Sequence, residues 1–90
     1  SEYKRDYVFL GTIGERVEPC VYEIDVKNQI RREDTIEYIG PDILFIEDQD
    51  FDLLDETRTI AEKANHGHTH FLRTEKEIEP GYIIRKEKSY

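Results

Sequence analysis

Hydrophobic and polar positions alternate along much of the chain with the period of two that is typical of a β-strand with one buried face. The clearest case is residues 20–27, in which Tyr22, Ile24 and Val26 share one face and Glu23, Asp25 and Lys27 share the other. Groups rich in β-branched and aromatic residues predict further strands at 7–13, 35–39, 68–73 and 82–85. The continuous apolar run 43–46 fits a central strand.

Turn signals separate these segments. Gly14-Glu15-Arg16, Gly40-Pro41-Asp42 and Pro80-Gly81 each contain residues that favour chain reversal. Residues 51–64 fit either one helix or two strands joined by a turn, and we favour the strands because Thr57 and Thr59 are poor helix formers. Six or seven short strands in 90 residues predict an all-β fold. It is either a sandwich or, as we expect, a small compact β-barrel.

Composition is compatible with one folded domain over residues 1–90. Hydrophobic residues make up 37% of the chain and aromatic residues 11%, which argues against disorder despite a charged fraction of 38%. No run approaches the roughly 20 apolar residues of a membrane helix, so we expect no membrane partner. A single cysteine, Cys20, favours a cytoplasmic location. The absence of methionine suggests a segment of a longer chain.

Three histidines at alternate positions are the first candidate for chemistry. His66, His68 and His70 would project to one side of a strand, where their ring nitrogens could share a metal ion with Cys20 or an acid. No fourth ligand is placed by the sequence, so we expect no metal site. The alternative of a histidine-cluster metal-binding module stays open.

Other motifs are incomplete. Residues 48–52 open like a calcium loop, but the sixth position is Leu53 and the twelfth is Thr59, so we expect the acidic stretch 47–56 to be a solvated face or loop. Gly11-Thr12-Ile13-Gly14 has the spacing of an RNA-clamping loop, yet it ends a predicted strand and fits a hairpin corner better. Cys20 is expected to be a buried or edge thiol. With serines only at positions 1 and 89, we expect no catalytic residue.

Positive charge is sparse, because the net charge is −8. A local basic patch could still gather from Arg31, Arg32, Arg73, Arg85, Lys86 and Lys88, and nearby tyrosines could stack on bases. Scattered solubilising charge is the simpler interpretation. A small RNA-binding barrel therefore remains an alternative, whereas no DNA partner is expected.

Several segments together resemble the C-terminal domain of the collagenase-like U-32 peptidase family. They are Asp6-Tyr7-Val8-Phe9-Leu10-Gly11, Val26-Lys27-Asn28-Gln29-Ile30, residues 34–41, Ala64-Asn65-His66 and residues 79–86. The resemblance covers about residues 3 to 86. It departs from the family at turns: Glu33 stands in place of a glycine, Asn65 in place of a proline, and residues 55–58 lack the glycine of the family's turn.

The resemblance implies a compact β-barrel appended to the catalytic domain of a longer, peptidase-like enzyme. Members of the family are linked to hydrolysis of collagen-like proteins or to RNA hydroxylation, with an iron–sulfur cluster in the catalytic domain. One cysteine cannot build a four-thiolate site, so we expect no cofactor in this domain. The expected partners are the catalytic domain of the same chain and a protein (collagen-like) or RNA substrate.

Under this interpretation the chain is a non-catalytic accessory domain that assists substrate recognition or positions the catalytic domain. Loops of small β-barrels can bind partners without disturbing the core. We expect the contact residues to be Asn28, Arg31 and Arg32 in one loop and Asn65, His66 and His68 in another.

Overall fold

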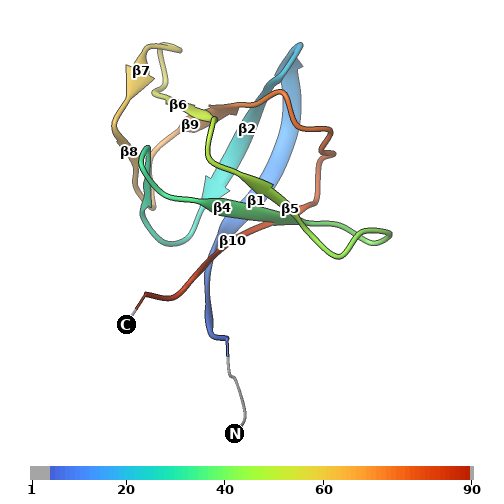
Figure 1. Cartoon of the computed structure of the whole chain (residues 1–90). Coiled ribbons are helices and arrows are strands. Elements are labelled where there is room, and N and C mark those ends of the chain that lie inside the picture. Colours follow the sequence, from blue (N-terminus) through green and yellow to red (C-terminus); the bar gives the residue numbers. More distant parts are fainter. Residues whose placement is uncertain (1–4, 90) are drawn as a thin grey trace, which may run out of the picture.

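The computed structural model describes residues 5–89, which form ten β-strands and no helix (Figure 1). The strands are β1 (Tyr7–Glu18), β2 (Val21–Val26), β3 (Ile30–Arg31), β4 (Ile36–Ile39), β5 (Ile46–Asp48), β6 (Asp52–Leu54), β7 (Ile60–Ala61), β8 (Lys63–Ala64), β9 (His70–Arg73) and β10 (Ile83–Glu87). The all-β prediction is confirmed. The described part of the chain has more strands than the six or seven expected, because three of them are two residues long and leave no alternation to detect. It contains no helix long and apolar enough to cross a membrane.

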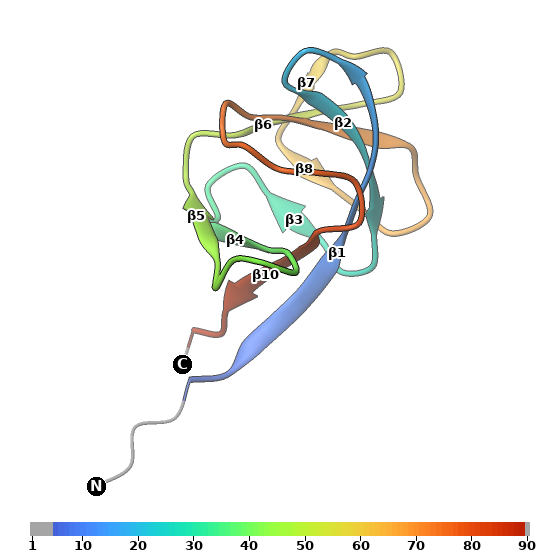
Figure 2. The same ribbon diagram turned by 90° about the vertical axis from the view of Figure 1, so that its right-hand side faces the viewer.

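Eight strands form one antiparallel sheet in the order β5-β4-β10-β1-β2-β9-β6-β7, and β3 pairs with β8 in a second sheet. In a flat sheet β5 and β6 would be six strand spacings, or about 29 Å, apart. Only residues 49–51 join the two strands, and a link of that length reaches about 15 Å at most. The sheet therefore curls into a half-barrel, in which the chain passes directly from β5 back to β6 (Figure 2).

The core lies on the inner side of this curl. β2 shows the predicted alternation, with Tyr22, Ile24 and Val26 buried and Glu23 and Asp25 exposed. The main buried cluster comprises Leu10, Ile13, Tyr22, Ile24, Val26, Ile30, Ile36, Tyr38, Phe51, Leu53, Ala64, Leu72, Ile78 and Ile84. It draws residues from both sheets, so burial of apolar surface holds the β3–β8 pair against the half-barrel.

The turn predicted at 14–16 is wrong. β1 continues to Glu18, and its pairing with β2 shifts register between Ile13 and Arg16 and again between Arg16 and Glu18. β-Bulges thus absorb these residues without reversing the chain. Gly11 and Gly14 both lie inside β1, so Gly11–Gly14 is not the expected hairpin corner.

The reversal between β1 and β2 instead occurs at Pro19–Cys20, where Cys20 has a φ of 67° and is exposed. The thiol is therefore not buried, and it lies at the hairpin turn directly before β2.

The central strand predicted at 43–46 is also wrong. The strand in this region, β5, begins at Ile46 and lies at the end of the sheet. Residues 40–45 form the loop of the β4–β5 hairpin, in which Leu44 is 88% exposed and Phe45 is 46% exposed. A continuous apolar run has no alternation of polar and apolar residues. Its position in the fold therefore depends on tertiary pairing, which the local sequence does not show.

The prediction for 51–64 is confirmed, because β6 and β7 pair antiparallel with Leu54 opposite Ile60. The strand expected at 68–73 begins only at His70. His68 therefore lies outside the strand, in the connection from β8.

Candidate functional site

Pairing of β3 with β8 brings the two predicted contact loops together. Ile30 lies opposite Ala64 and Arg31 opposite Lys63. Gln29 Nε2 donates a 2.7 Å hydrogen bond to Asn65 Oδ1, and the Arg32 amide donates a 2.8 Å bond to the Glu62 carbonyl. The residues 28–32 and 62–66 thus form one surface, which we call the β3–β8 surface.

Local sequence explains which side chains this surface presents. Ile30 and Ala64 are fully buried, and strand alternation turns the next positions, Arg31 and Lys63, outward. Both cations are exposed, and among residues 5–89 neither takes part in an ion pair of 4.0 Å or less. The Arg31 amide donates to Asp34 Oδ2 at 2.8 Å, which fixes the backbone that carries the guanidinium. Two like charges therefore face each other across a strand pair.

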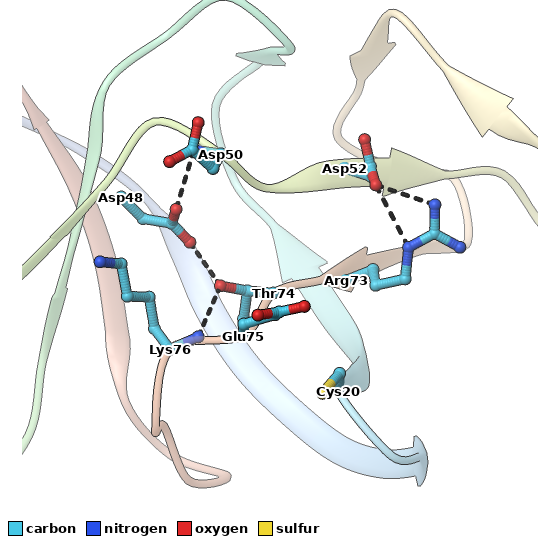
Figure 3. A pocket seen from close by; sticks show the side chains of 8 residues that line it. All are labelled: Cys20, Asp48, Asp50, Asp52, Arg73, Thr74, Glu75 and Lys76. Atoms are coloured by element: carbon cyan, nitrogen blue, oxygen red, sulfur yellow. Dashed lines mark hydrogen bonds and ion pairs between the residues drawn. The ribbon is translucent and has the colours of Figure 1, made fainter.

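Arg32 is held differently. Its Nε lies 3.4 Å from Asp52 Oδ1, while Arg73 Nη2 lies 2.8 Å from Asp52 Oδ2 (Figure 3). One carboxylate on β6 thus links two guanidinium groups, and it ties the residue after β3 to the large sheet. Arg32 is partly neutralised and supports the β3–β8 surface more than it extends the positive charge.

The other predicted contact residues have separate surroundings. Asn28 Nδ2 donates to the Phe9 carbonyl at 2.7 Å and fixes the chain after β2. His66, at the end of the β3–β8 surface, and His68, two residues further along the chain, are both exposed. His70 is buried, with Nδ1 3.2 Å from the Leu54 carbonyl oxygen.

The structure does not bring the three histidines together on one face, because His66 and His68 are exposed and His70 is buried. The ring centroids of His68 and His70 are 6.4 Å apart, and the two side chains differ in burial. Within residues 5–89, no group of three or more His, Cys, Asp or Glu side chains is arranged to hold a metal ion. The three residues do not lie on one strand, because β9 starts only at His70.

The cations that could form a local basic patch are mostly paired with acids. Arg85 pairs with Glu37 at 2.9 Å and lies 3.6 Å over the Tyr7 ring, and Lys86 pairs with Asp34 at 3.3 Å. Arg73 pairs with Asp52. Each of these three cations is therefore engaged with an acid, and Arg73 shares its acid with Arg32.

A second feature, which the sequence did not predict, is a buried carboxylate. Asp48 is only 2% exposed, although the acidic stretch 47–56 was expected to be solvated. Its carboxylate accepts a hydrogen bond from Tyr38 Oη at 2.7 Å. It also accepts bonds from Thr74 Oγ1 at 2.5 Å and from the Asp50 amide at 3.0 Å (Figure 3). Burial, followed by the hydrogen bond to this carboxylate, raises the pKa of Tyr38 far above its ordinary value.

The hydrogen bonds to the Asp48 carboxylate hold the fold together and leave no oxygen free for a ligand. The Asp48 oxygens are occupied by donors, and Phe51 inside the acidic stretch is fully buried, so the segment is not an open calcium loop. Asp48 lies beside an open hollow of about 460 Å³ that Cys20, Asp50, Asp52, Arg73, Thr74, Glu75 and Lys76 also line. No local signal marks Asp48 for burial, since two of its three partners lie 10 and 26 residues away.

Solved structures share this fold. Two crystal structures match, both of the C-terminal domain of a Geobacillus thermoleovorans protein assigned to the U32 peptidases, one of them a selenomethionine variant. The variant has a TM-score of 0.73 and 22% identity, with 88% of this chain and 99% of that chain covered. The other has a TM-score of 0.74 and 21% identity, with 89% and 92% covered. A search of curated proteins found no match.

The family follows from the sequence match. Residues 5–85 match the peptidase family U32 C-terminal domain, which is nearly the whole of the chain. The segments that carry the resemblance lie in β1, in the β2–β3 turn, in β4 and its following turn, after β8 and in β10. The chain therefore belongs to the family of U32 peptidase C-terminal domains.

Proposed function

We propose that this chain is the non-catalytic accessory domain of a longer U32 peptidase-like protein, and that it contacts its partner through the β3–β8 surface. The domain would hold the catalytic domain, or the substrate of that domain, in place. Family membership supports this role. The pairing of β3 with β8 supports the assignment of the surface, because it joins two loops that are more than thirty residues apart in sequence.

The observation that carries the proposal is the cross-strand pair Arg31–Lys63. Like charges directly opposite each other destabilise a strand pair. Each cation also lacks an ion-pair partner within residues 5–89. A negatively charged partner would relieve the repulsion and gain two ionic contacts. An acidic surface is therefore the complement that this site fits, and we assign that surface to the catalytic domain of the same protein.

RNA is the second candidate, because the same two cations could contact phosphates. The net charge of −8 opposes it, since phosphate binding depends on a concentrated positive face. A cytoplasmic location also belongs to the proposal: Cys20 is free and exposed, and a reducing compartment would keep it so.

The test uses the complete protein that carries this domain. We expect Arg31→Glu and Lys63→Glu, made separately, to lower kcat/KM several-fold. Lys76→Glu is the matched control, because Lys76 is an exposed cation without an ion pair of 4.0 Å or less among residues 5–89 and lies in the segment 74–79, outside the β3–β8 surface. Equal activity in all three variants would refute the assignment of the surface.

A binding assay separates the RNA candidate. The 90-residue chain is titrated with single-stranded RNA at 50 and 200 mM salt. Phosphate contacts predict a steep loss of affinity with salt that Arg31→Glu reduces. Absence of binding at the lower salt concentration would remove RNA as the partner.

A further inference from the structure

A groove lies on another side of the molecule, between the β4–β5 hairpin and the segment 74–79. Its volume is about 570 Å³. Tyr22 and Ile78 form its floor with Tyr82, and Ile43 and Ile46 of the hairpin form one wall. Figure 2 shows these two chain segments facing the viewer, and in Figure 1 the hairpin and β8 project from opposite sides of the molecule.

The wall of this groove is an open sheet edge. β5 is the terminal strand of the eight-stranded sheet, so only its β4 side is paired. Leu44 and Phe45, directly before β5, are two of the most exposed large apolar side chains of the described chain, at 88% and 46%. An unpaired strand edge beside exposed apolar residues is a template for a further strand.

The opposite rim is acidic. Glu75, Glu77 and Glu79 are exposed at alternate positions, and all three line the groove. Among residues 5–89, none of them takes part in an ion pair of 4.0 Å or less. Lys76 and Arg16 are the cations of the lining, so acids outnumber bases there.

We propose that this groove binds an extended polypeptide segment in which basic side chains alternate with apolar ones, added as a strand along the outer edge of β5. The backbone of the segment would pair with β5, because strand addition takes its affinity from main-chain hydrogen bonds. Its apolar side chains would cover Tyr82 and Ile43 in the groove and the exposed ring of Phe45 next to it. Its basic side chains would meet the glutamate rim. The β3–β8 surface plays no part, so the two proposals can fail separately.

The experiment measures binding of the 90-residue chain to a labelled ten-residue peptide of alternating arginine and valine, by fluorescence anisotropy. A glutamate–valine peptide of equal length tests charge. An arginine–valine peptide with two central prolines tests backbone pairing, because proline cannot donate to a ladder. We expect the first peptide to bind and each of the others to bind at least tenfold more weakly. Amide shifts in the NMR spectrum should concentrate at residues 43–48 and 74–79.

Two variants test the residues. Leu44→Ser/Phe45→Ser and Glu75→Lys/Glu77→Lys should each weaken binding about tenfold, since all four side chains are exposed and their replacement leaves the core intact. Glu33→Lys/Glu62→Lys makes the same charge change away from the groove and should keep the affinity within twofold. Equal binding of the acidic and basic peptides, equal loss in the control variant, or shifts centred on the β3–β8 surface would overturn the proposal.

Discussion

The phenol of Tyr38 donates a hydrogen bond of 2.7 Å to the carboxylate of Asp48, and both side chains are almost completely buried. Tyr38 lies on β4 and Asp48 on β5, and Thr74, directly after β9, donates the second side-chain bond at 2.5 Å. Because β5 and β9 are far apart in the order of the sheet, the Asp48–Thr74 bond joins the two sides of the half-barrel across its opening. The buried carboxylate thus stabilises the curl of the sheet.

Removal of one donor should be costly. Tyr38→Phe keeps the ring in the core but deletes the hydroxyl group, and hydrogen bonds to charged groups contribute about 1.5–3 kcal/mol. We expect the free energy of unfolding to fall by about that amount in urea titrations. Tyr82→Phe is the matched control, because Tyr82 is half-buried and its hydroxyl group makes no hydrogen bond within residues 5–89. Equal losses in the two variants would contradict the role of the carboxylate.

The same residue predicts a pH dependence. Burial raises the pKa of Tyr38 in the folded state, whereas in the unfolded state it titrates near 10. Above pH 10 the unfolded chain releases this proton and the folded chain keeps it, so stability falls as pH rises. Between pH 9 and 11 the wild-type chain should lose about 1.4 kcal/mol more than Tyr38→Phe. Parallel stability curves for the two proteins would refute the shift in pKa.

The sequence predicts those parts of the fold that depend on neighbouring residues, and it does not predict those that depend on residues far apart in the chain. The alternation of Tyr22, Ile24 and Val26 is local and sufficient to identify β2. The burial of Asp48 depends on Tyr38 and Thr74, which are distant in sequence and have no pattern that links them to it. The run at 43–46 is apolar enough for a core strand, but its position at the end of the sheet depends on how the whole sheet is ordered.

In the candidate site, too, the sequence indicated the individual loops but not their contact in the fold. The sequence singled out the loops around Arg31 and Asn65 separately, the latter through motif resemblance. Their contact arises from a two-residue pairing of β3 with β8, which is too short to show any period. The alternation of His66, His68 and His70 was a real pattern, but the strand begins at His70 and the first two histidines lie in the connection before it.

Gly11 should tolerate no side chain. A Cβ atom there would lie 2.1 Å from the Asp25 carbonyl oxygen, and its φ of +153° is one that other residues rarely adopt. We expect Gly11→Ala to reduce the free energy of unfolding by about 3 kcal/mol or more, because strain and overpacking add. Gly67→Ala measures the cost of backbone strain alone, because Gly67 has a φ of +87° and open space around it. This substitution should lower the free energy of unfolding by about 1–2 kcal/mol. Similar losses would mean that the contact with Asp25 is relieved by movement of the strands.

Added zinc should leave the melting temperature unchanged. A metal that binds only the folded state raises stability in proportion to the logarithm of its concentration over Kd. His70 is buried, with Nδ1 3.2 Å from the Leu54 carbonyl oxygen, whereas His66 and His68 are exposed, so the three rings do not face one common point. A scan with zinc in tenfold excess over the chain, against a scan with a chelator, measures this. A rise of several degrees that His66→Ala abolishes would show that the histidines do gather around a metal.

Arg31 should reveal a conflict between stability and binding. In the isolated domain its guanidinium faces Lys63 across the β3–β8 pair, an arrangement of like charges that is destabilising. Arg31→Glu converts it into an opposite-charge pair, which should raise the free energy of unfolding by about 0.2–1 kcal/mol. A charge-neutral Arg31→Gln should give a smaller gain, and Arg31→Glu/Lys63→Glu should lose the benefit because the charges are again alike.

If the same Arg31→Glu change also lowers kcat/KM of the complete protein, the positive pair is retained for contact with a partner and not for folding. Lower stability in Arg31→Glu would show instead that the guanidinium is favourably placed in the free domain, and the repulsion on which the proposed function rests would not exist.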